Sequence, residues 1–170
     1  MIRTLLCMLL ICLGTISANS QESIAREWSE ELLEAIRNDF ARPTVHARNL
    51  FHSSVLMYDA WSIFDDTSVP LFLGKSFGGF QVPFDGIAIP DNEADLEAAR
   101  DEVISYAVFR LLMHRFDGSP GEDDTLPALE AKFASLSYDA SFTDTDYSTG
   151  SFAALGNYMA EQMIAFGLQD

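Results

Sequence analysis

The sequence predicts an all-α protein, a bundle of about five helices with a long loop rich in Gly, Pro and Phe between the second and third helices. Apolar residues recur at three- and four-residue steps in five stretches, which is the period of an α-helix. Glycine and proline are concentrated between these stretches, where the chain has to turn. The 170 residues are 48% hydrophobic, which is enough for one packed core, and no internal repeat divides them.

The first helix is expected from Ser23 to Phe40. Ser23 is a suitable N-cap, because its hydroxyl can accept a hydrogen bond from an N–H group of the first turn. The pair Arg42-Pro43 ends the helix, since proline disfavours the helical conformation in the residue before it. The apolar positions of this helix are Ile24, Trp28, Leu32, Ala35, Ile36 and Phe40.

The second helix is expected from Pro43 to Phe64, and Asp65-Asp66 closes it. Pro43 suits the first turn, where its missing N–H has no partner to lose. At ~100° per residue, one broad arc is predicted to face the core. This arc contains Ala47, Leu50, Phe51, Ser54, Met57, Tyr58 and Trp61, flanked by His46, Asn49 and Ser53 on one side and by Arg48, His52 and Asp59 on the other.

Residues 67–90 lack the helical period and are expected to form the long loop, because prolines and glycines alternate there with Phe72, Phe77, Phe80 and Phe84. These phenylalanines are expected to pack the loop down, and a functional loop is the alternative. Three more helices are expected, and they cover residues 92–116 with Asp91 or Asn92 as N-cap, residues 123–136 with Pro127 in the first turn, and residues 148–166 with Gly167 as the stop.

The first 20 residues are typical of a secretory signal peptide. Arg3 supplies the positive start, and the apolar run from Leu5 to Leu13 is short for a membrane span. Cleavage is expected near Ser20 or after Ala18, which leaves residues 21–170 as the helical domain in a secreted or periplasmic protein. An uncleaved membrane anchor is the alternative interpretation.

Charge and cysteine content exclude several classes of protein. Residues 1–20 contain Arg3 and no acidic residue, so their removal moves the formal net charge from −16 to −17. Such an acidic chain repels phosphate backbones and anionic lipid heads, which argues against nucleic-acid or membrane partners. Cys7 and Cys12 both lie in the signal segment, so the remainder has no disulfide and no thiolate metal ligand.

One polar cluster, in the second helix and just before it, is the candidate site. Its members are Arg42, His46, Arg48, Asn49, His52 and Asp59. His46 and His52 are six residues apart, ~120° in direction on a helix, whereas histidines that share a metal are usually four apart. We therefore expect a structural network, with a metal site as the alternative. His114 and Arg115 are expected to complement the dipole at the end of the third helix.

Several motifs of the chain resemble the N-terminal helical part of bacterial proteins related to vanadium-dependent haloperoxidases and type 2 phosphatidic acid phosphatases. The specific part covers residues 25–28 (AREW), 31–33 (ELL), 35–39 (AIRND), 41–52 (ARPTVHARNLFH) and 57–61 (MYDAW). Looser similarity continues at residues 73–75, 78–80, 153–156 and 167–168. The resemblance implies an all-helical fold and, in full-length relatives, a second helical region that binds vanadate or phosphate.

The chemistry of that family belongs to the second region, where a lysine, arginines and a Gly-His pair hold the oxyanion. This chain has no Gly-His pair, since His46, His52 and His114 follow other residues. We therefore assign no catalytic, cofactor-binding or metal-binding residue, and expect vanadate only in full-length relatives. The templates of serine hydrolases, P-loop proteins, dinucleotide-binding proteins and HExxH metalloproteases are also absent from the sequence.

The resemblance predicts a truncated, inactive scaffold whose fifth helix exposes an apolar face. Its expected partner is the missing C-terminal helical segment, or a second copy that associates through exposed apolar helix faces. A stand-alone exported helical module for binding or assembly is the alternative function. Halide oxidation and phosphate-ester cleavage in the full-length relative stay equally open.

Overall fold

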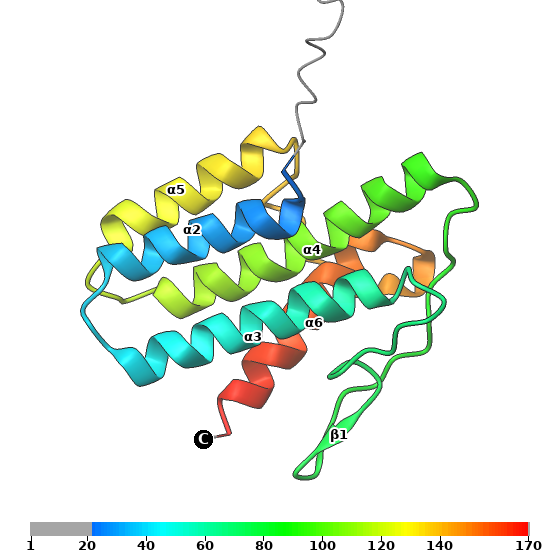
Figure 1. The fold of residues 1–170 in the computed structure, drawn as a ribbon, viewed down its shortest axis with the longest axis horizontal. Coiled ribbons are helices and arrows are strands. Elements are labelled where there is room, and N and C mark those ends of the chain that lie inside the picture. Colours follow the sequence, from blue (N-terminus) through cyan, green and yellow to red (C-terminus); the bar gives the residue numbers. More distant parts are fainter. Residues whose placement is uncertain (1–21, 170) are drawn as a thin grey trace, which may run out of the picture.

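The computed structural model describes residues 22–169, so the predicted signal segment and its cleavage site lie outside the described residues. These residues form five α-helices, one short 3-10 helix and one two-stranded hairpin (Figure 1). The protein is therefore mainly helical, as the sequence predicts. The elements are α2 (Ile24–Asn38), α3 (Pro43–Ser62), β1 (Ser76–Phe77), β2 (Phe80–Gln81), α4 (Glu93–Phe116), α5 (Glu122–Ser135), η1 (Tyr147–Thr149) and α6 (Phe152–Gly167).

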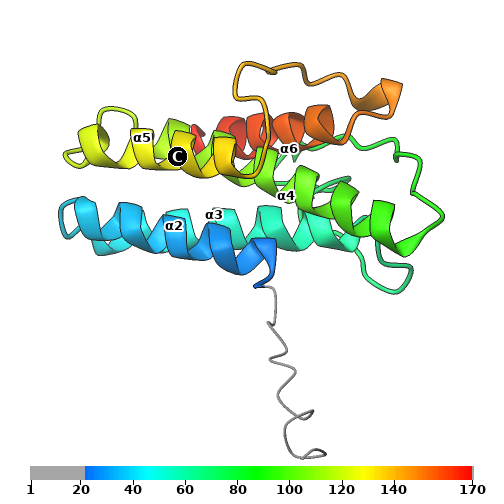
Figure 2. The same ribbon diagram turned by 90° about the horizontal axis from the view of Figure 1, so that it is seen from above.

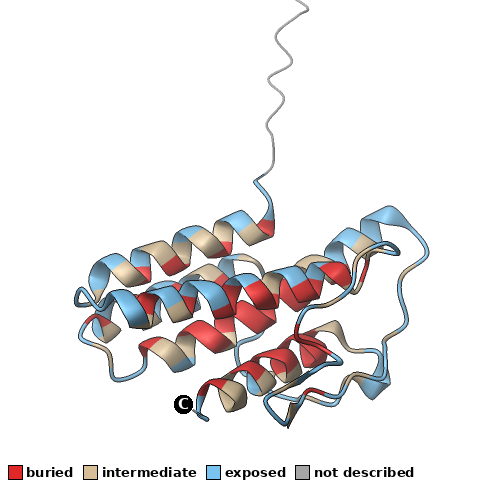
Figure 3. Ribbon diagram, turned by 60° about the horizontal axis from the view of Figure 1, so that its bottom comes forward, coloured by how far each residue is buried: buried red, intermediate tan, exposed pale blue. Residues whose placement is uncertain are grey.

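Helix α4 is the centre of the bundle and contacts each of the other four helices. Figure 2 shows α2 and α3 in one layer and α5 and α6 in another, with α4 running obliquely between the two layers. Burial is highest along α4 and on the sides of the other helices that face it (Figure 3). No helix among residues 22–169 is both long and apolar enough to cross a lipid bilayer.

Local capping explains where most of the helices begin. The side chains of Ser23 and Asn92 accept hydrogen bonds from the backbone N–H groups three residues later. The N-cap prediction for Ser23 is confirmed, and of the two candidates Asp91 and Asn92, the cap is Asn92. The last helix begins later than expected, at Phe152, because Ser151 caps it after the short η1 turn. Pro127 lies in the second turn of α5, so its expected place in the first turn is wrong.

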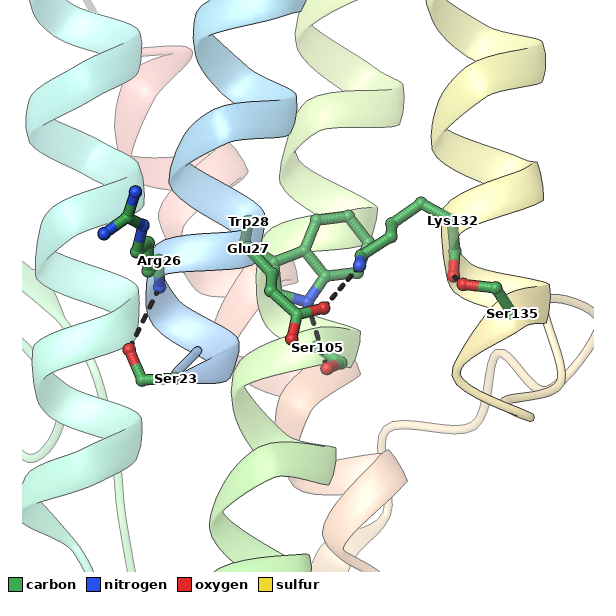
Figure 4. Close-up of polar contacts among 7 residues, drawn as sticks. All are labelled: Ser23, Arg26, Glu27, Trp28, Ser105, Lys132 and Ser135. Atoms are coloured by element: carbon green, nitrogen blue, oxygen red, sulfur yellow. Dashed lines mark hydrogen bonds and ion pairs between the residues drawn. The ribbon is translucent and has the colours of Figure 1, made fainter. Parts of the chain in front are cut away.

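Aromatic side chains fill the space between α2, α4 and α5. The rings of Phe109 and Phe133 stack at 4.0 Å, and Trp28 packs against both at 6.3 Å. The Trp28 indole N–H donates to the Ser105 hydroxyl at 3.0 Å, so the polar atom of this buried ring has a partner (Figure 4). Figure 4 also shows Lys132 of α5 paired with a carboxylate of α2, which joins the two helices at the edge of the core.

Helices α4 and α6 approach each other most closely at Gly156. A Cβ atom at this position would lie 2.6 Å from Tyr106 Cβ and 2.7 Å from the Val103 carbonyl oxygen. Both distances are far inside van der Waals contact, so the packing of α6 on α4 requires a residue without a side chain here.

The apolar side of α6 faces the bundle. Leu155, Met159 and Met163 are buried, and Phe152 and Phe166 are half-buried. The expectation that this last helix exposes an apolar face is therefore wrong. The apolar side of α6 is buried because it packs along α4, a contact that the sequence did not predict.

The segment between α3 and α4 was expected to be an irregular loop throughout, but it contains the β1–β2 hairpin. Strands β1 and β2 pair antiparallel, and the turn between them consists of Gly78 and Gly79, which have φ angles of 57° and 96°. Glycine adopts such angles without a steric penalty. Phe72, Phe77 and Phe80 of this segment contact the ring of Phe166 at centroid distances of 5.5, 6.0 and 5.7 Å. The hairpin is thus attached to the last turn of α6.

A second irregular segment, residues 139–146, is held by polar side chains of α4 and α6. Arg110 donates to the carbonyl oxygens of Ala140 and Phe142, both at 2.8 Å, and to the Asn157 amide oxygen at 3.0 Å. The Asn157 amide N–H₂ group donates in turn to the carbonyl oxygens of Phe142 and Asp144. These bonds satisfy backbone groups that have no partner in a helix or a sheet.

Candidate functional site

Helix α3 carries the polar cluster, and its orientation is the reverse of the predicted one. Most of the arc expected to face the core faces solvent, where Leu50, Phe51, Tyr58 and Trp61 are exposed by 40, 59, 44 and 38%. Met57, which is half-buried against the core, is the exception. We call this arc, residues 47, 50, 51, 54, 57, 58 and 61, the outer face of α3. The opposite side is buried and consists of His46, Asn49, His52, Ser53, Val55, Leu56, Asp59, Ala60 and Ser62.

The two sides separate cleanly around the helix. At ~100° per residue, all outer-face positions lie within about 60° of Ser54, and the buried positions occupy the rest of the circle. The arc itself was predicted correctly, but its direction was wrong. An amphipathic helix normally turns its apolar side to the core, so the buried polar groups of α3 need partners inside the protein.

Asp59 has the best-defined partners of the buried polar residues. One oxygen of its fully buried carboxylate accepts the Leu71 N–H at 2.6 Å, and the other accepts the N–H groups of Phe72 at 2.8 Å and Leu73 at 2.6 Å. Burial raises the pKa of the Asp59 carboxyl, and the three N–H groups and Lys75 offset part of this rise. The carboxylate thus fixes the start of the segment that leads into the hairpin.

His52 is joined to the end of α4 by a contact that the sequence did not suggest. The Arg115 guanidinium lies 3.0 Å from His52 Nδ1. Because arginine can only donate, Nδ1 is the acceptor, and a neutral ring carries its proton on Nε2. A Cβ atom on Gly167 would lie 2.3 Å from Arg115 Nη2 and 3.3 Å from His52 Cε1. A side chain on Gly167, the last residue of α6, would therefore displace the Arg115 guanidinium from this position.

The remaining cluster residues have separate surroundings. His46 Nε2 lies 2.8 Å from the Phe40 carbonyl oxygen, and Arg42 is exposed and paired with Asp39. Arg48 is half-buried, whereas Asn49 is buried. His46 Nδ1, Asn49 Oδ1 and Ser53 Oγ have no hydrogen-bond partner among residues 22–169. Four of the six cluster residues thus lie on the buried side of α3, Arg42 and Arg48 do not, and the cluster does not converge on one point.

The described residues 22–169 also contain His, Asp, Glu and cationic side chains that lie outside the polar cluster of α3. No group of three His, Asp or Glu residues there is arranged to hold a metal ion. Most of the cations are engaged with different partners in different places. Arg26, Arg37, Arg42 and Lys132 pair with Glu22, Glu34, Asp39 and Glu27, and Arg110 binds backbone carbonyl groups.

The outer face of α3 continues onto the segment that follows the helix. The Tyr58 hydroxyl donates to the Val69 carbonyl oxygen at 3.2 Å, and the side chains of Val69 and Leu71 are 61 and 51% exposed. Beside Phe51 lies an apolar cavity of about 100 Å³. It is lined by Phe51, His52, Val55, Leu71, Phe72, Phe77, Met163 and Phe166. A ridge of large side chains next to an apolar hollow is typical of a surface that binds another protein element.

Comparisons of the chain with protein-family models, with curated proteins and with solved structures each found no match. The resemblance to haloperoxidase-like proteins therefore stays a prediction from the quoted motifs.

Proposed function

We propose that this chain is the N-terminal helical scaffold of an exported haloperoxidase-like protein, and that the outer face of α3 is its docking surface for another helical element. The observation that carries this proposal is the orientation of α3. Four large side chains of the outer face stay accessible, while Asp59 and His52 take interior positions. A contiguous group of large exposed side chains of this kind marks a surface that another element covers.

The motif match supports the scaffold role. The strongest motif, residues 41–52, falls on the start of α3 and supplies three of the six buried polar residues and three of the seven outer-face positions. In the family that the chain resembles, the vanadate or phosphate chemistry belongs to a second helical region. The separate engagement of the cations named above fits a chain that supports such chemistry without performing it.

Turnover assays test this proposal. The purified chain should show no vanadate-dependent oxidation of bromide or chloride and no phosphatase activity above a buffer control. Heat-denatured chain serves as the control for contaminating metal. Turnover that follows the folded chain through purification and is lost with its unfolding would overturn the scaffold function.

A stand-alone exported module for helical assembly is the second candidate. The burial of the apolar side of α6 favours it, because the described bundle closes its own core without another segment. Cooperative thermal unfolding of a monodisperse sample supports this module, whereas dye-binding, non-cooperative material supports the role of a scaffold that depends on a further segment.

A further inference from the structure

We infer that the occupant of the outer α3 face is a second copy of this chain, which packs its own α3 antiparallel about a two-fold axis through Ser54. The inference rests on the docking role proposed above and names the partner. Three observations carry it: the spacing of the outer-face residues, their sizes, and the distribution of charge around them.

The spacing is that of a helix–helix seam. The positions 47, 50, 54, 57 and 61 are separated by three, four, three and four residues, which is the repeat of two helices packed side by side. The seven outer-face positions are symmetric about Ser54, so a two-fold axis there pairs residue 47 with 61, 50 with 58, and 51 with 57 of the other copy. The seam runs for four turns, from Ala47 to Trp61.

The side-chain sizes are complementary in this register. Ala47 of one copy meets Trp61 of the other, so a small residue receives the largest one. Leu50 meets Tyr58, and the two Ser54 side chains meet at the centre, where their size allows the helices to approach closely. The same pairs repeat on the other side of the axis, as a two-fold interface requires.

The distribution of charge also favours contact between two outer faces. Asp59 is the single acidic residue between Pro43 and Ser62 and is fully buried, so the outer face carries no carboxylate in a chain of net charge −16. Two such acidic chains repel each other at most other surfaces. Two outer faces can therefore meet without bringing carboxylates of α3 together.

A cysteine placed on the axis tests the register directly. In a background with Cys7→Ser and Cys12→Ser, Ser54→Cys brings two thiols together and should form a disulfide-linked dimer under mild oxidation. The matched control, Ala128→Cys on the exposed side of α5, should stay monomeric on a non-reducing gel. Cross-linking of both variants alike, or of neither, contradicts the proposed interface.

Solution mass gives the second test, by light scattering over a concentration series. The chain should have the mass of two copies, Ala47→Glu the mass of one, and the control Ala128→Glu the mass of two. Added salt should tighten the dimer, because it screens the net repulsion. A chain that stays single at every concentration, or a dimer that survives Ala47→Glu, overturns the inference. Either result leaves the proposed scaffold function standing, since that function is refuted by turnover.

Discussion

Replacing Asp59 by asparagine removes the charge of a buried carboxylate but keeps its size. In the folded chain this carboxylate accepts three backbone N–H groups, from Leu71, Phe72 and Leu73, at 2.6 to 2.8 Å. An asparagine side chain has one acceptor oxygen, and its N–H₂ group must point at N–H donors in either orientation. At least one backbone N–H therefore loses its partner in a buried place.

The magnitude follows from the number of bonds affected. A hydrogen bond to a charged group contributes about 1.5–3 kcal/mol, and a buried donor without a partner costs about 1–3 kcal/mol. Asp59→Asn keeps at most two of the three bonds, so the free energy of unfolding should fall by about 2–4 kcal/mol. Asp59→Ala loses all three bonds, and the fall should be larger, about 4–6 kcal/mol, because such losses are not fully additive.

Urea unfolding gives the free energies, and amide hydrogen exchange locates the effect. In the wild-type chain the N–H groups of Leu71, Phe72 and Leu73 should be protected, and in Asp59→Asn they should exchange faster than those of α4. A matched surface change, Asp66→Asn, should alter neither quantity, since Asp66 is exposed. The reasoning is refuted if Asp59→Asn unfolds within about 0.5 kcal/mol of wild type, the ordinary range for surface changes, with the three amides still protected.

Three further changes test the packing of α4. Gly156→Ala places a methyl group 2.6 Å from Tyr106 Cβ, so circular-dichroism melts should show a destabilisation of about 1–3 kcal/mol or more, and an unchanged melt would contradict the close contact. Ser105→Ala leaves the Trp28 indole N–H without its acceptor, which should cost about 1–3 kcal/mol in urea unfolding. Burial raises the pKa of Tyr138 to about 12. Because the unfolded chain releases this proton near pH 10, stability should fall between about pH 10 and 12, by no more than about 2 kcal/mol, and Tyr138→Phe should remove that fall.

Local chemistry made the helices predictable. The side chains and the apolar pattern that follows them predict Ser23 as one N-cap and Asp91 or Asn92 as another, and the interactions of Ser23 and Asn92 form within four residues. Pro43 was placed in the first turn of its helix for the same kind of reason. Such interactions are predictable because both partners lie within a few residues of each other in the sequence.

The direction of α3 depends on groups that are distant in the sequence. Asp59 can be buried because the N–H groups of residues 71–73 donate hydrogen bonds to it. His52 can be buried because it accepts a hydrogen bond from Arg115, which lies 63 residues further along the chain. No periodicity or motif in the sequence indicates that these groups contact Asp59 and His52. Amphipathicity therefore located the two sides of the helix but selected the wrong one for the core. The candidate docking surface followed from the coordinates and not from the pattern.

Arg110 and Asn157 hold residues 139–146 in place without a covalent bond. Many exported proteins fasten their irregular segments with covalent bridges, and residues 22–169 contain no cysteine with which to do so. Here a guanidinium and an amide hold the backbone of residues 139–146 through bonds that need no oxidising compartment to form. Reducing agents do not break these hydrogen bonds, and the bonds form again after each local opening. Residues 139–146 should therefore be cleaved slowly by endoproteases, because the bonds keep the backbone from extending into a protease active site.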